Sequence, residues 1–467
     1  LKAWWTRSTT FTLPSFCWQR LGSNAHRIIY RGIIKVVTRV NTVTFQGIDV
    51  IGIDVQVQVS NGLPAFNIVG LPDKAVAESK ERVRAALHSL GITLPAKRIT
   101  VNLAPADVLK EGSHFDLPIA LGLLSIINVL PTEELAEYCV VGELALDGKI
   151  SPVSGVLPTT IFAMQHGFSV ICPAACGSEA AWVENVKILP APDLISLINH
   201  FKGTQILTQP QIKQTEHYET YLDFKDIKGQ ESAKRAMEIA AAGGHNLLMI
   251  GPPGSGKSML AQRLPSILPP LTPQEILEIS LIHSIAGLIK DGVLVNKRPF
   301  RDPHHSASLP AIVGGGSKAK PGEITLAHHG ILFLDELPEF SRVALESLRQ
   351  PIENGKVVIA RANSHVTYPA RFQLITAMNP CRCGHLGDPE LACTRAPKCA
   401  LEYQSKISGP IFDRIDLHID VPALKASELS LPVPKEDSNT IRTRVIKARN
   451  IQIERYKNAK LPSISCN

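Results

Sequence analysis

The fold prediction starts from Gly251-Pro-Pro-Gly-Ser-Gly-Lys257-Ser258, a glycine-rich stretch between two regular segments. Residues 245–250 form a short apolar run typical of a buried strand, and residues 259–264 have a helical pattern. This order predicts a phosphate-binding loop, in which backbone N–H groups and a helix N-terminus face a nucleoside triphosphate. The alternative is a Gly/Pro-rich surface turn. The nucleotide-contacting residues expected are Gly251, Pro252, Pro253, Gly254, Ser255, Gly256, Lys257 and Ser258.

A second motif, Ile331-Leu-Phe-Leu-Asp335-Glu336, is an apolar strand that ends in two acids. Alone, such an ending is common and often marks only a strand that meets solvent. Together with the glycine-rich loop it predicts an ATP hydrolase that uses Mg²⁺. We expect Lys257 to contact the β- and γ-phosphates, Ser258 and Asp335 to hold Mg²⁺, and Glu336 to polarise the attacking water.

Charge does not point to a nucleic-acid partner, although the net charge is +7. Residues 1–39 contain seven of the 49 Lys and Arg residues and no acid, so the remaining 42 bases match the 42 acids. The rest of the chain is therefore neutral overall. The composition, with 44% hydrophobic and 19% charged residues over 467 positions, predicts a globular protein of two or three domains.

Residues 1–38 are rich in basic, aromatic and hydroxyl side chains, without a clear apolar period. We interpret them as a translated leader or a cloning artefact without a stable fold, and an organellar transit peptide is the alternative. No run of eighteen apolar residues occurs, so no membrane partner is expected. Nine cysteines without a secretory signal favour the reducing cytoplasm over a disulfide framework.

The domain division follows shifts in sequence pattern. Residues 39–201 begin with alternating strands and contain an amphipathic helix at 73–90, which indicates an α/β or α+β domain. Residues 202–221 are polar and glutamine-rich, as in a linker. Residues 222–424 form the predicted ATPase core, in which 355–368 read as strand, turn, strand. Residues 425–467 contain further helix.

Several motifs resemble one family, the ComM (YifB) group of magnesium-chelatase-like AAA+ ATPases. The similarity covers about residues 37–467 and depends on the two motifs above and on five further stretches. These are Gly229-Gln-Glu-Ser-Ala-Lys-Arg-Ala236, Phe300-Arg-Asp-Pro-His-His-Ser306, Val313-Gly-Gly-Gly316, Pro321-Gly-Glu-Ile324 and Ile407-Ser-Gly-Pro-Ile-Phe-Asp-Arg-Ile-Asp-Leu417.

The resemblance implies a hexameric, ATP-driven DNA helicase of the branch-migration type, active in natural transformation and recombination. It implies that Asn379 is the sensor that orients the water beside the γ-phosphate. It also implies that Arg414 is an arginine finger that reaches the nucleotide of the next subunit. Two alternatives stay open: a magnesium-chelatase motor subunit, and an ATP-binding assembly module without turnover.

The same resemblance places two segments at the pore of the ring. One is the strand-turn-strand of residues 355–368, and the other is the insertion at residues 301–320. Spaced cations on such loops suit sequence-independent phosphate contact, whereas the alternative is an ordinary surface loop. The DNA-contacting candidates are Lys318, Lys320, Arg361 and His365.

Four cysteines, Cys381, Cys383, Cys393 and Cys399, crowd into 19 residues. Four soft ligands in one loop suit a tetrahedral structural Zn²⁺, and free cysteines are the alternative.

The N-terminal domain is similar to the proteolytic domain of Lon through Val141-Gly-Glu-Leu-Ala-Leu-Asp-Gly-Lys-Ile-Ser-Pro-Val-Ser-Gly155. The Lon nucleophile position falls on His114 and the Lon lysine position on Leu157, so we expect a Lon-like α/β fold without peptidase chemistry. The neighbouring Ser113, Lys110 and Lys149 do not occupy matching positions. Family members continue into a helical lid with a second sensor arginine, which makes 425–467 a truncated lid. A decayed reading frame is the corresponding alternative.

Overall fold

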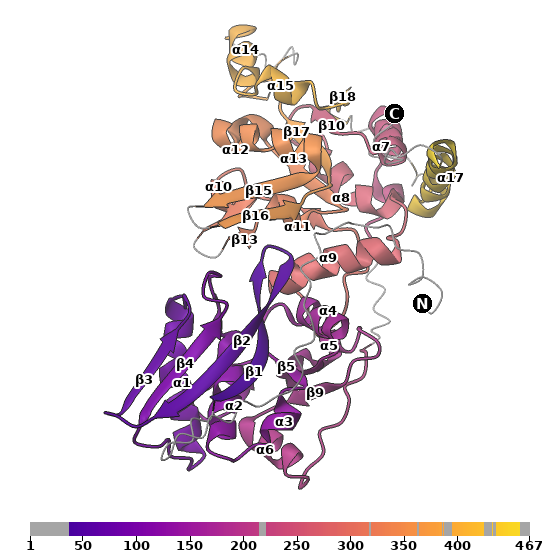
Figure 1. The fold of residues 1–467 in the computed structure, drawn as a ribbon. Helices are drawn as coiled ribbons and strands as arrows, with labels where there is room; N and C mark the ends of the chain where they lie inside the picture. Colours follow the sequence, from indigo (N-terminus) through magenta and orange to yellow (C-terminus); the bar gives the residue numbers. More distant parts are fainter. Residues whose placement is uncertain are drawn as a thin grey trace. The chain divides into compact units, whose positions relative to one another are not determined.

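The computed structural model describes residues 37–213, 221–316, 319–361, 364–384, 386, 395–424, 432 and 436–457. Helices and strands alternate along these ranges, and the strands form two separate large sheets (Figure 1). The α/β prediction is confirmed. Residues 1–36, which make up most of the predicted leader, lie outside the described part of the chain.

The first sheet has seven strands in the order β3-β4-β2-β1-β5-β8-β9. It begins with the antiparallel pair β1 (Val37–Gln46) and β2 (Asp49–Ser60), in register from Val37↔Gln58 to Gln46↔Asp49. On β2 the apolar Ile53, Val55 and Val57 are buried and alternate with polar residues, as the sequence pattern predicts. The other strands are β3 (Ala65–Val69), β4 (Arg98–Ala104), β5 (Tyr138–Val140), β8 (Ser169–Pro173) and β9 (Ile188–Ala191).

Strand β1 begins at Val37, two residues before the predicted boundary at residue 39. The strand is longer because Val37 and Thr38 still pair with Gln58 and Val57 of β2. At the other end, helix α6 (Leu194–Phe201) stops where the polar segment begins.

Two helices that pack against this sheet show how the local sequence determines where a helix begins and how deeply it is buried. The predicted amphipathic helix is α1 (Lys74–Ser89), and it begins where the Asp73 side chain accepts a 2.7 Å hydrogen bond from Val76 N. Helix α2 (Asp116–Ile126) is buried on nearly every side, which explains its uniformly apolar sequence. The shorter elements are η1 (Ser113–Phe115), α3 (Thr132–Leu135), β6 (Glu143–Leu144), β7 (Ile150–Ser151), α4 (Val156–His166), η2 (Ala174–Cys176) and α5 (Gly177–Ala180).

The second sheet is wholly parallel, in the order β11-β14-β17-β10-β18. Its strands are β10 (Leu247–Ile250), β11 (Phe300–Arg301), β14 (Ile331–Leu334), β17 (Gln373–Met378) and β18 (Leu417–Asp420). Strands β10, β14 and β17 are almost completely buried, as expected when helices cover both faces of a parallel sheet. Their carboxyl ends meet at one edge, where the glycine-rich loop begins and the acidic-strand motif ends.

The main helices of this part are α7 (Glu231–Gly243), α8 (Lys257–Ile267), α9 (Pro273–Ile285) and α17 (Ser438–Tyr456). Helix α17 contacts α7 and α8 and buries Ile441 and Val445 against them (Figure 1). The predicted helix in the C-terminal segment is therefore present, and its assignment as part of a lid stays a prediction. The shorter helices are η3 (Phe224–Asp226), α10 (Leu309–Val313), α11 (Glu323–Leu326), η4 (Leu337–Glu339), α12 (Arg342–Ser347), α13 (Arg349–Asn354), α14 (Lys398–Gln404) and α15 (Gly409–Phe412).

Two small hairpins complete the fold. Strands β15 (Lys356–Arg361) and β16 (Ser364–Pro369) form the predicted strand-turn-strand. Strands β12 (Gly314–Gly315) and β13 (Lys320–Pro321) form the second hairpin, within the predicted insertion. The two hairpins touch, because Tyr368 Oη donates a 2.8 Å hydrogen bond to Ala319 O.

Within the described part of the chain, no helix combines the length and the apolar character that crossing a bilayer requires.

Candidate functional site

The glycine-rich loop connects β10 to α8. Gly254 has φ +74° and Gly256 has φ +92°, a left-handed backbone that favours glycine. Gly256 is the N-cap of α8. The N–H groups of the first helical turn, which have no acceptor within the helix, therefore lie at the end of the loop. This geometry gives the loop the capacity to bind an anion with backbone donors and the helix dipole.

Lys257 lies inside the loop, with its side chain almost fully buried. Its Nζ donates to Gly251 O at 2.8 Å and to Pro252 O at 2.9 Å, and it lies 3.3 Å from Asn379 Oδ1. Burial lowers the pKa of Lys257, and the nearby carboxylates oppose this shift. The ammonium is thus partly desolvated, and the carbonyl oxygens of the loop itself hold it.

Two hydrogen bonds in series connect the two motifs. Ser258 Oγ donates a 2.7 Å hydrogen bond to Asp335 Oδ2, and Asp335 Oδ1 accepts one of 2.9 Å from Glu336 N. A hydroxyl and a carboxylate side by side are the oxygen ligands that Mg²⁺ prefers. These residues fit the metal that the sequence predicts.

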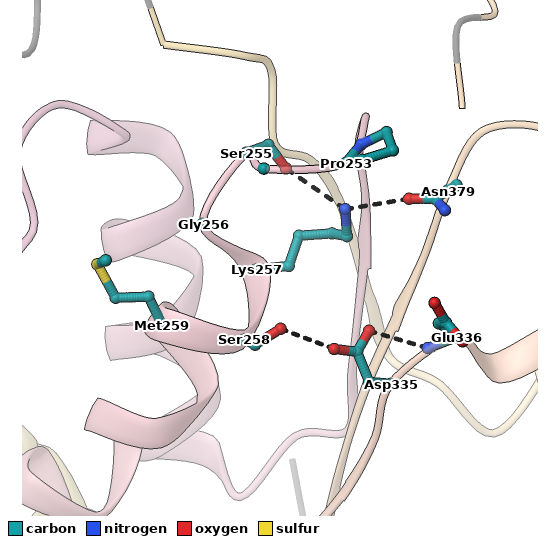
Figure 2. A pocket seen from close by; sticks show the side chains of 10 residues that line it. Pro253, Ser255, Gly256, Lys257, Ser258, Met259, Asp335, Glu336 and Asn379 are labelled. Atoms are coloured by element: carbon teal, nitrogen blue, oxygen red, sulfur yellow. Dashed lines mark hydrogen bonds between the residues drawn. The ribbon is translucent and has the colours of Figure 1, made fainter. Parts of the chain in front are cut away.

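A cavity of about 370 Å³ lies over this group. Figure 2 shows Lys257 Nζ between Ser255 and Asn379, with Ser258, Asp335 and Glu336 in a row beneath it. The volume suits a cofactor-sized ligand. The cavity is lined by Pro253, Gly254, Ser255, Gly256, Lys257, Ser258, Met259, Asp335, Glu336 and Asn379. The structure therefore brings together most of the predicted catalytic and nucleotide-contacting residues.

Arg414 is the predicted catalytic residue that does not line this cavity. It follows α15, and its guanidinium forms an ion pair with Glu353 of α13 and a hydrogen bond to Pro410 O. About a quarter of its side chain is exposed. Its role in the site of a neighbouring copy stays a prediction.

Asp302 and His305 belong to the same edge of the sheet. Both lie in the family motif at residues 300–306 and in the insertion at residues 301–320, and the motifs assign neither a role at the nucleotide site. Asp302 follows β11, and burial together with the charge of Asp335 raises its pKa. His305 Nδ1 lies 3.2 Å from Glu336 Oε2. Besides their place in that motif, the local signal is that both residues follow a short strand. Strand pairing is needed to show that this strand lies beside β14.

The cysteine cluster lies directly after Asn379. Cys381 Sγ and Cys383 Sγ are 3.1 Å apart, and Cys399 Sγ lies within 4.8 Å of both. Cys393 lies outside the described residues. Gly384 has φ +86°, and a Cβ there would be 2.6 Å from Pro253 Cδ, so this turn packs against the phosphate loop. Three converging thiols fit a soft metal ion such as Zn²⁺.

The DNA-contacting candidates lie on the two hairpins. Lys320 is exposed on β13, whereas Lys318 lies outside the described residues. Arg361 ends β15, and His365 lies near the start of β16, paired with Ala360. Both therefore belong to the turn end of the hairpin, and the structure leaves their side chains undescribed.

The N-terminal residues considered for Lon-like chemistry have other partners. His114 Nε2 lies 2.9 Å from Val43 O, and burial lowers the pKa of His114 to about 4. Leu157 is buried in the first turn of α4. The Ser113 hydroxyl contacts the Glu143 carboxylate. Of the two lysines, Lys110 donates to Pro105 O, and Lys149 pairs with Asp147 at 2.9 Å.

Comparison with known proteins places the chain. Family models described as "Magnesium chelatase, subunit ChlI" and "Subunit ChlI of Mg-chelatase" match residues 223–429 and 55–175. YifB of Salmonella typhimurium is 44% identical over 425 residues, which cover 90% of this chain and 84% of YifB. Competence protein ComM of Haemophilus influenzae is 44% identical over 411 residues, 86% of this chain and 80% of ComM.

The chain belongs to the magnesium-chelatase-like ComM/YifB family. The prediction made from the motifs is confirmed. Lon protease 2 of Bacillus subtilis is 28% identical over 158 residues, 30% of this chain and 26% of that protein. The Lon-like similarity is thus also borne out, and the parallel sheet with its phosphate loop is the AAA+ part of a ComM/YifB protein.

Proposed function

We propose that this ComM/YifB-family protein is an ATP-driven motor that acts on DNA as a hexameric ring in the cytoplasm. The observation that carries the proposal is the convergence of Lys257, Ser258, Asp335 and Asn379 around one cavity. This arrangement supplies an anion-binding loop, a pair of oxygen ligands and a polar amide within one site. Hydrolysis of ATP is the reaction that uses all of them.

The proposed roles follow from position. Lys257 moves from the loop carbonyls to the β- and γ-phosphates, and Asn379, which it already contacts, orients the attacking water. Glu336, which directly follows the metal ligand, takes up that water's proton. Ser258 and Asp335 would hold Mg²⁺, which supplies charge neutralisation at the phosphates. Arg414 reaches the site of the neighbouring copy and stabilises transition-state charge.

The DNA part of the proposal depends on the two touching hairpins and on the relative named competence protein ComM. Lys320 and Arg361 on separate loops provide cations for the phosphate backbone without reading bases. We propose branched or single-stranded DNA as the substrate for movement.

The deciding experiment is an ATPase assay with and without forked DNA. We expect hydrolysis that forked DNA stimulates and that Lys257→Ala and Glu336→Gln abolish. A chain that binds ATP but never exceeds the rate of both variants would instead be an ATP-binding assembly module.

A magnesium-chelatase motor subunit is the second candidate, favoured by the family model that matches residues 223–429. It predicts hydrolysis that responds to a porphyrin and a partner subunit, and that is indifferent to DNA.

We also propose that Cys381, Cys383 and Cys399, with Cys393 as the predicted fourth ligand, hold a structural Zn²⁺. Its contribution would be to rigidify the turn that packs on Pro253. Elemental analysis of the purified protein should find about one zinc per chain, as a four-thiolate site binds one ion, and less in Cys381→Ser. Reduced cysteines with no zinc would rule out this site.

A further inference from the structure

We propose that the N-terminal domain binds an extended acidic peptide, which adds a strand to the open edge of the seven-stranded sheet at β3. Two features of the domain support this ligand. One is the edge strand β3, which has a neighbouring strand on one side. The other is a cavity of about 430 Å³ at the start of that strand. The site lies on a different sheet from the nucleotide cavity, and it is independent of the proposed function.

Strand β3 lies at the edge of its sheet (Figure 1). It pairs in parallel with β4, from Ala65↔Arg98 to Val69↔Asn102, and among the described residues no strand pairs with its other side. An edge strand presents a row of main-chain N–H and C=O groups to any further strand. An extended peptide binds such a row through its own main chain. The free edge therefore selects a ligand in the extended conformation.

The opposite edge of the same sheet is closed. Strand β9 contains Pro190, which has no N–H to donate. The N–H of Ile188 donates a 2.8 Å hydrogen bond to the Gln209 side chain, and Gln209 Nε2 donates one of 3.0 Å to Val186 O. Strand β3, by contrast, contains no proline and no charged side chain, the residues that commonly keep an edge strand from pairing. The sheet can thus be extended at β3 and not at β9.

The exposed side chains along this edge are uncharged. Phe66 is buried in the core, whereas Asn67 and Val69 are exposed. Val69 is 45% exposed, and Leu63, which precedes the strand, is 88% exposed. Cross-strand pairs with apolar side chains stabilise an added strand. This edge therefore favours a ligand with apolar residues at alternate positions.

The cavity at the start of β3 combines basic and apolar side chains. Its basic residues are Arg84 and His88 of α1 and Lys97, which precedes β4. Among the described residues, no carboxylate lines the cavity, and none of these three side chains has an ion pair or a hydrogen bond. An acidic side chain is the group that such donors bind most strongly. The other lining residues are Pro64, Ala65, Ile92, Thr93, Leu94, Pro95, Ala96 and Ile99.

The fold of α1 does not use these basic side chains. Lysine, arginine or histidine near the end of a helix often bonds to the last carbonyl groups. Here main-chain donors bond to those groups, because Gly91 N donates to His88 O and Ile92 N donates to Leu87 O, both at 3.0 Å. The charges are therefore left for a ligand.

Charge and backbone chemistry distinguish the possible occupants. Residues 1–39 of the same chain contain seven Lys and Arg residues and no acid, so like charges oppose their binding here. A nucleic acid is anionic, but its backbone has no N–H and C=O groups to continue the sheet. A peptide in which acidic and apolar residues alternate satisfies both the cavity and the strand edge.

The first test measures binding of labelled peptides to the whole chain by fluorescence anisotropy. A short peptide in which Val and Glu alternate should bind, and the matching Val–Lys peptide should bind at least about tenfold more weakly because it repels the basic residues. Arg84→Glu and Lys97→Glu should each weaken binding of the Val–Glu peptide at least about tenfold, as charge-assisted hydrogen bonds are lost.

The matched control is Lys80→Glu, which makes the same change of charge at an exposed position of α1 outside the cavity. Its affinity should stay within about twofold of wild type, because salt screens a charge that does not contact the ligand. The melting temperatures of all three variants should stay near that of wild type, since the three side chains are exposed.

A second test examines the strand edge and leaves the protein unchanged. Successive residues of an extended peptide direct their N–H groups to opposite edges. Methylation of the main-chain nitrogen of every Val therefore blocks one edge of the peptide, and methylation at every Glu blocks the other. We expect one of these two peptides to lose affinity at least about tenfold and the other to bind like the unmodified peptide. Amide hydrogen exchange in β3 should slow when the unmodified peptide is bound.

Three results would overturn the proposal. One is a Val–Glu peptide that binds no more tightly than the Val–Lys peptide, or whose affinity is the same in Arg84→Glu and Lys97→Glu as in wild type. Another is an equal effect of the two methylation patterns, which would exclude pairing with β3. The third is displacement of the peptide by inorganic phosphate or by a single-stranded oligonucleotide at equal concentration, which would show a general anion site.

Discussion

Ser258 Oγ and Asp335 Oδ2 are joined by a 2.7 Å hydrogen bond, although 77 positions separate them in the chain. The bond ties the first turn of α8 to the end of β14, and it puts a hydroxyl and a carboxylate oxygen at the distance that two ligands of one Mg²⁺ ion need. The nucleotide loop and the acidic strand are thus one site.

The first prediction concerns this pair. Ser258→Ala should reduce kcat/KM for Mg·ATP at least about tenfold, since one metal ligand is lost. Ser258→Thr keeps the hydroxyl and should retain most activity. A titration with Mg²⁺ checks the cause, because Ser258→Ala should need more Mg²⁺ for half-maximal rate. Equal behaviour of the two variants would show that the hydroxyl is not a ligand.

A second prediction separates binding from hydrolysis. Glu336→Gln should lower kcat by about 10²–10⁴, the usual value of a general base. Its affinity for ATP should stay near that of wild type, because Lys257 and the loop are intact. Lys257→Ala should lose affinity as well. Fluorescent-nucleotide binding and single-turnover hydrolysis measure the two quantities, and loss of binding in Glu336→Gln would contradict the assignment.

The third prediction tests whether Arg414 acts in a neighbouring copy. Arg414→Ala should reduce kcat by about 10³, the lower range for an arginine finger. Mixing Arg414→Ala with the inactive Lys257→Ala should restore part of the activity. Mixed assemblies contain sites with an intact Lys257 from one copy and an intact Arg414 from the next. If subunits exchange and the ATPase activity does not recover, Arg414 acts in the site of its own copy or has no role in catalysis.

A fourth prediction concerns stability of the N-terminal part. Asp116 is fully buried and accepts from Arg82 Nε at 2.6 Å and Nη2 at 2.9 Å. Arg82→Ala leaves a buried charge without its partner and should cost about 3–5 kcal/mol of unfolding free energy. Lys149→Ala removes the exposed pair with Asp147 and should leave the unfolding free energy close to that of wild type. Denaturant unfolding at neutral pH measures both.

The pH dependence of that variant has a defined sign. Burial raises the pKa of Asp116 above 3.8, while Arg82 lowers it. In Arg82→Ala the pKa rises further, so the folded state binds a proton over a wider range of pH than the unfolded state. The free energy of unfolding of the variant therefore decreases as pH rises through that range. The cost of the substitution should be smaller at pH 5 than at pH 8, and the reverse order would contradict this account.

Some parts of the fold were predictable because their signals are local. The alternation in β2 follows from the pleat of a strand with one buried face. The helix at residues 74–89 follows from an Asp cap and an apolar stripe. The hairpin of β15 and β16 needs only two β-prone runs around a short turn.

Other relationships had no local signal. Asn379 lies beside Lys257 because β17 pairs with β10 on one side and β14 on the other. His305 meets Glu336 because β11 occupies the edge next to β14. The turn at Gly384 packs on Pro253 because both leave neighbouring strands at one edge. In a parallel sheet, the partners are distant in sequence, and residue spacing does not specify strand order.

The amino-acid sequence by itself determined the phosphate loop and the helix that follows it, the acidic strand, the β15–β16 hairpin, and through the motifs the ComM/YifB family. These features depend on interactions within a few residues. Glycine content, the period of the apolar residues and the charges at the ends of strands decide which local backbone conformation has the lowest free energy. Only the tertiary structure decided which side chains share the cavity, that Arg414 pairs with Glu353, and that His305 faces Glu336. Those outcomes depend on the pairing order of strands and on packing between distant segments, which the burial of the whole sheet determines.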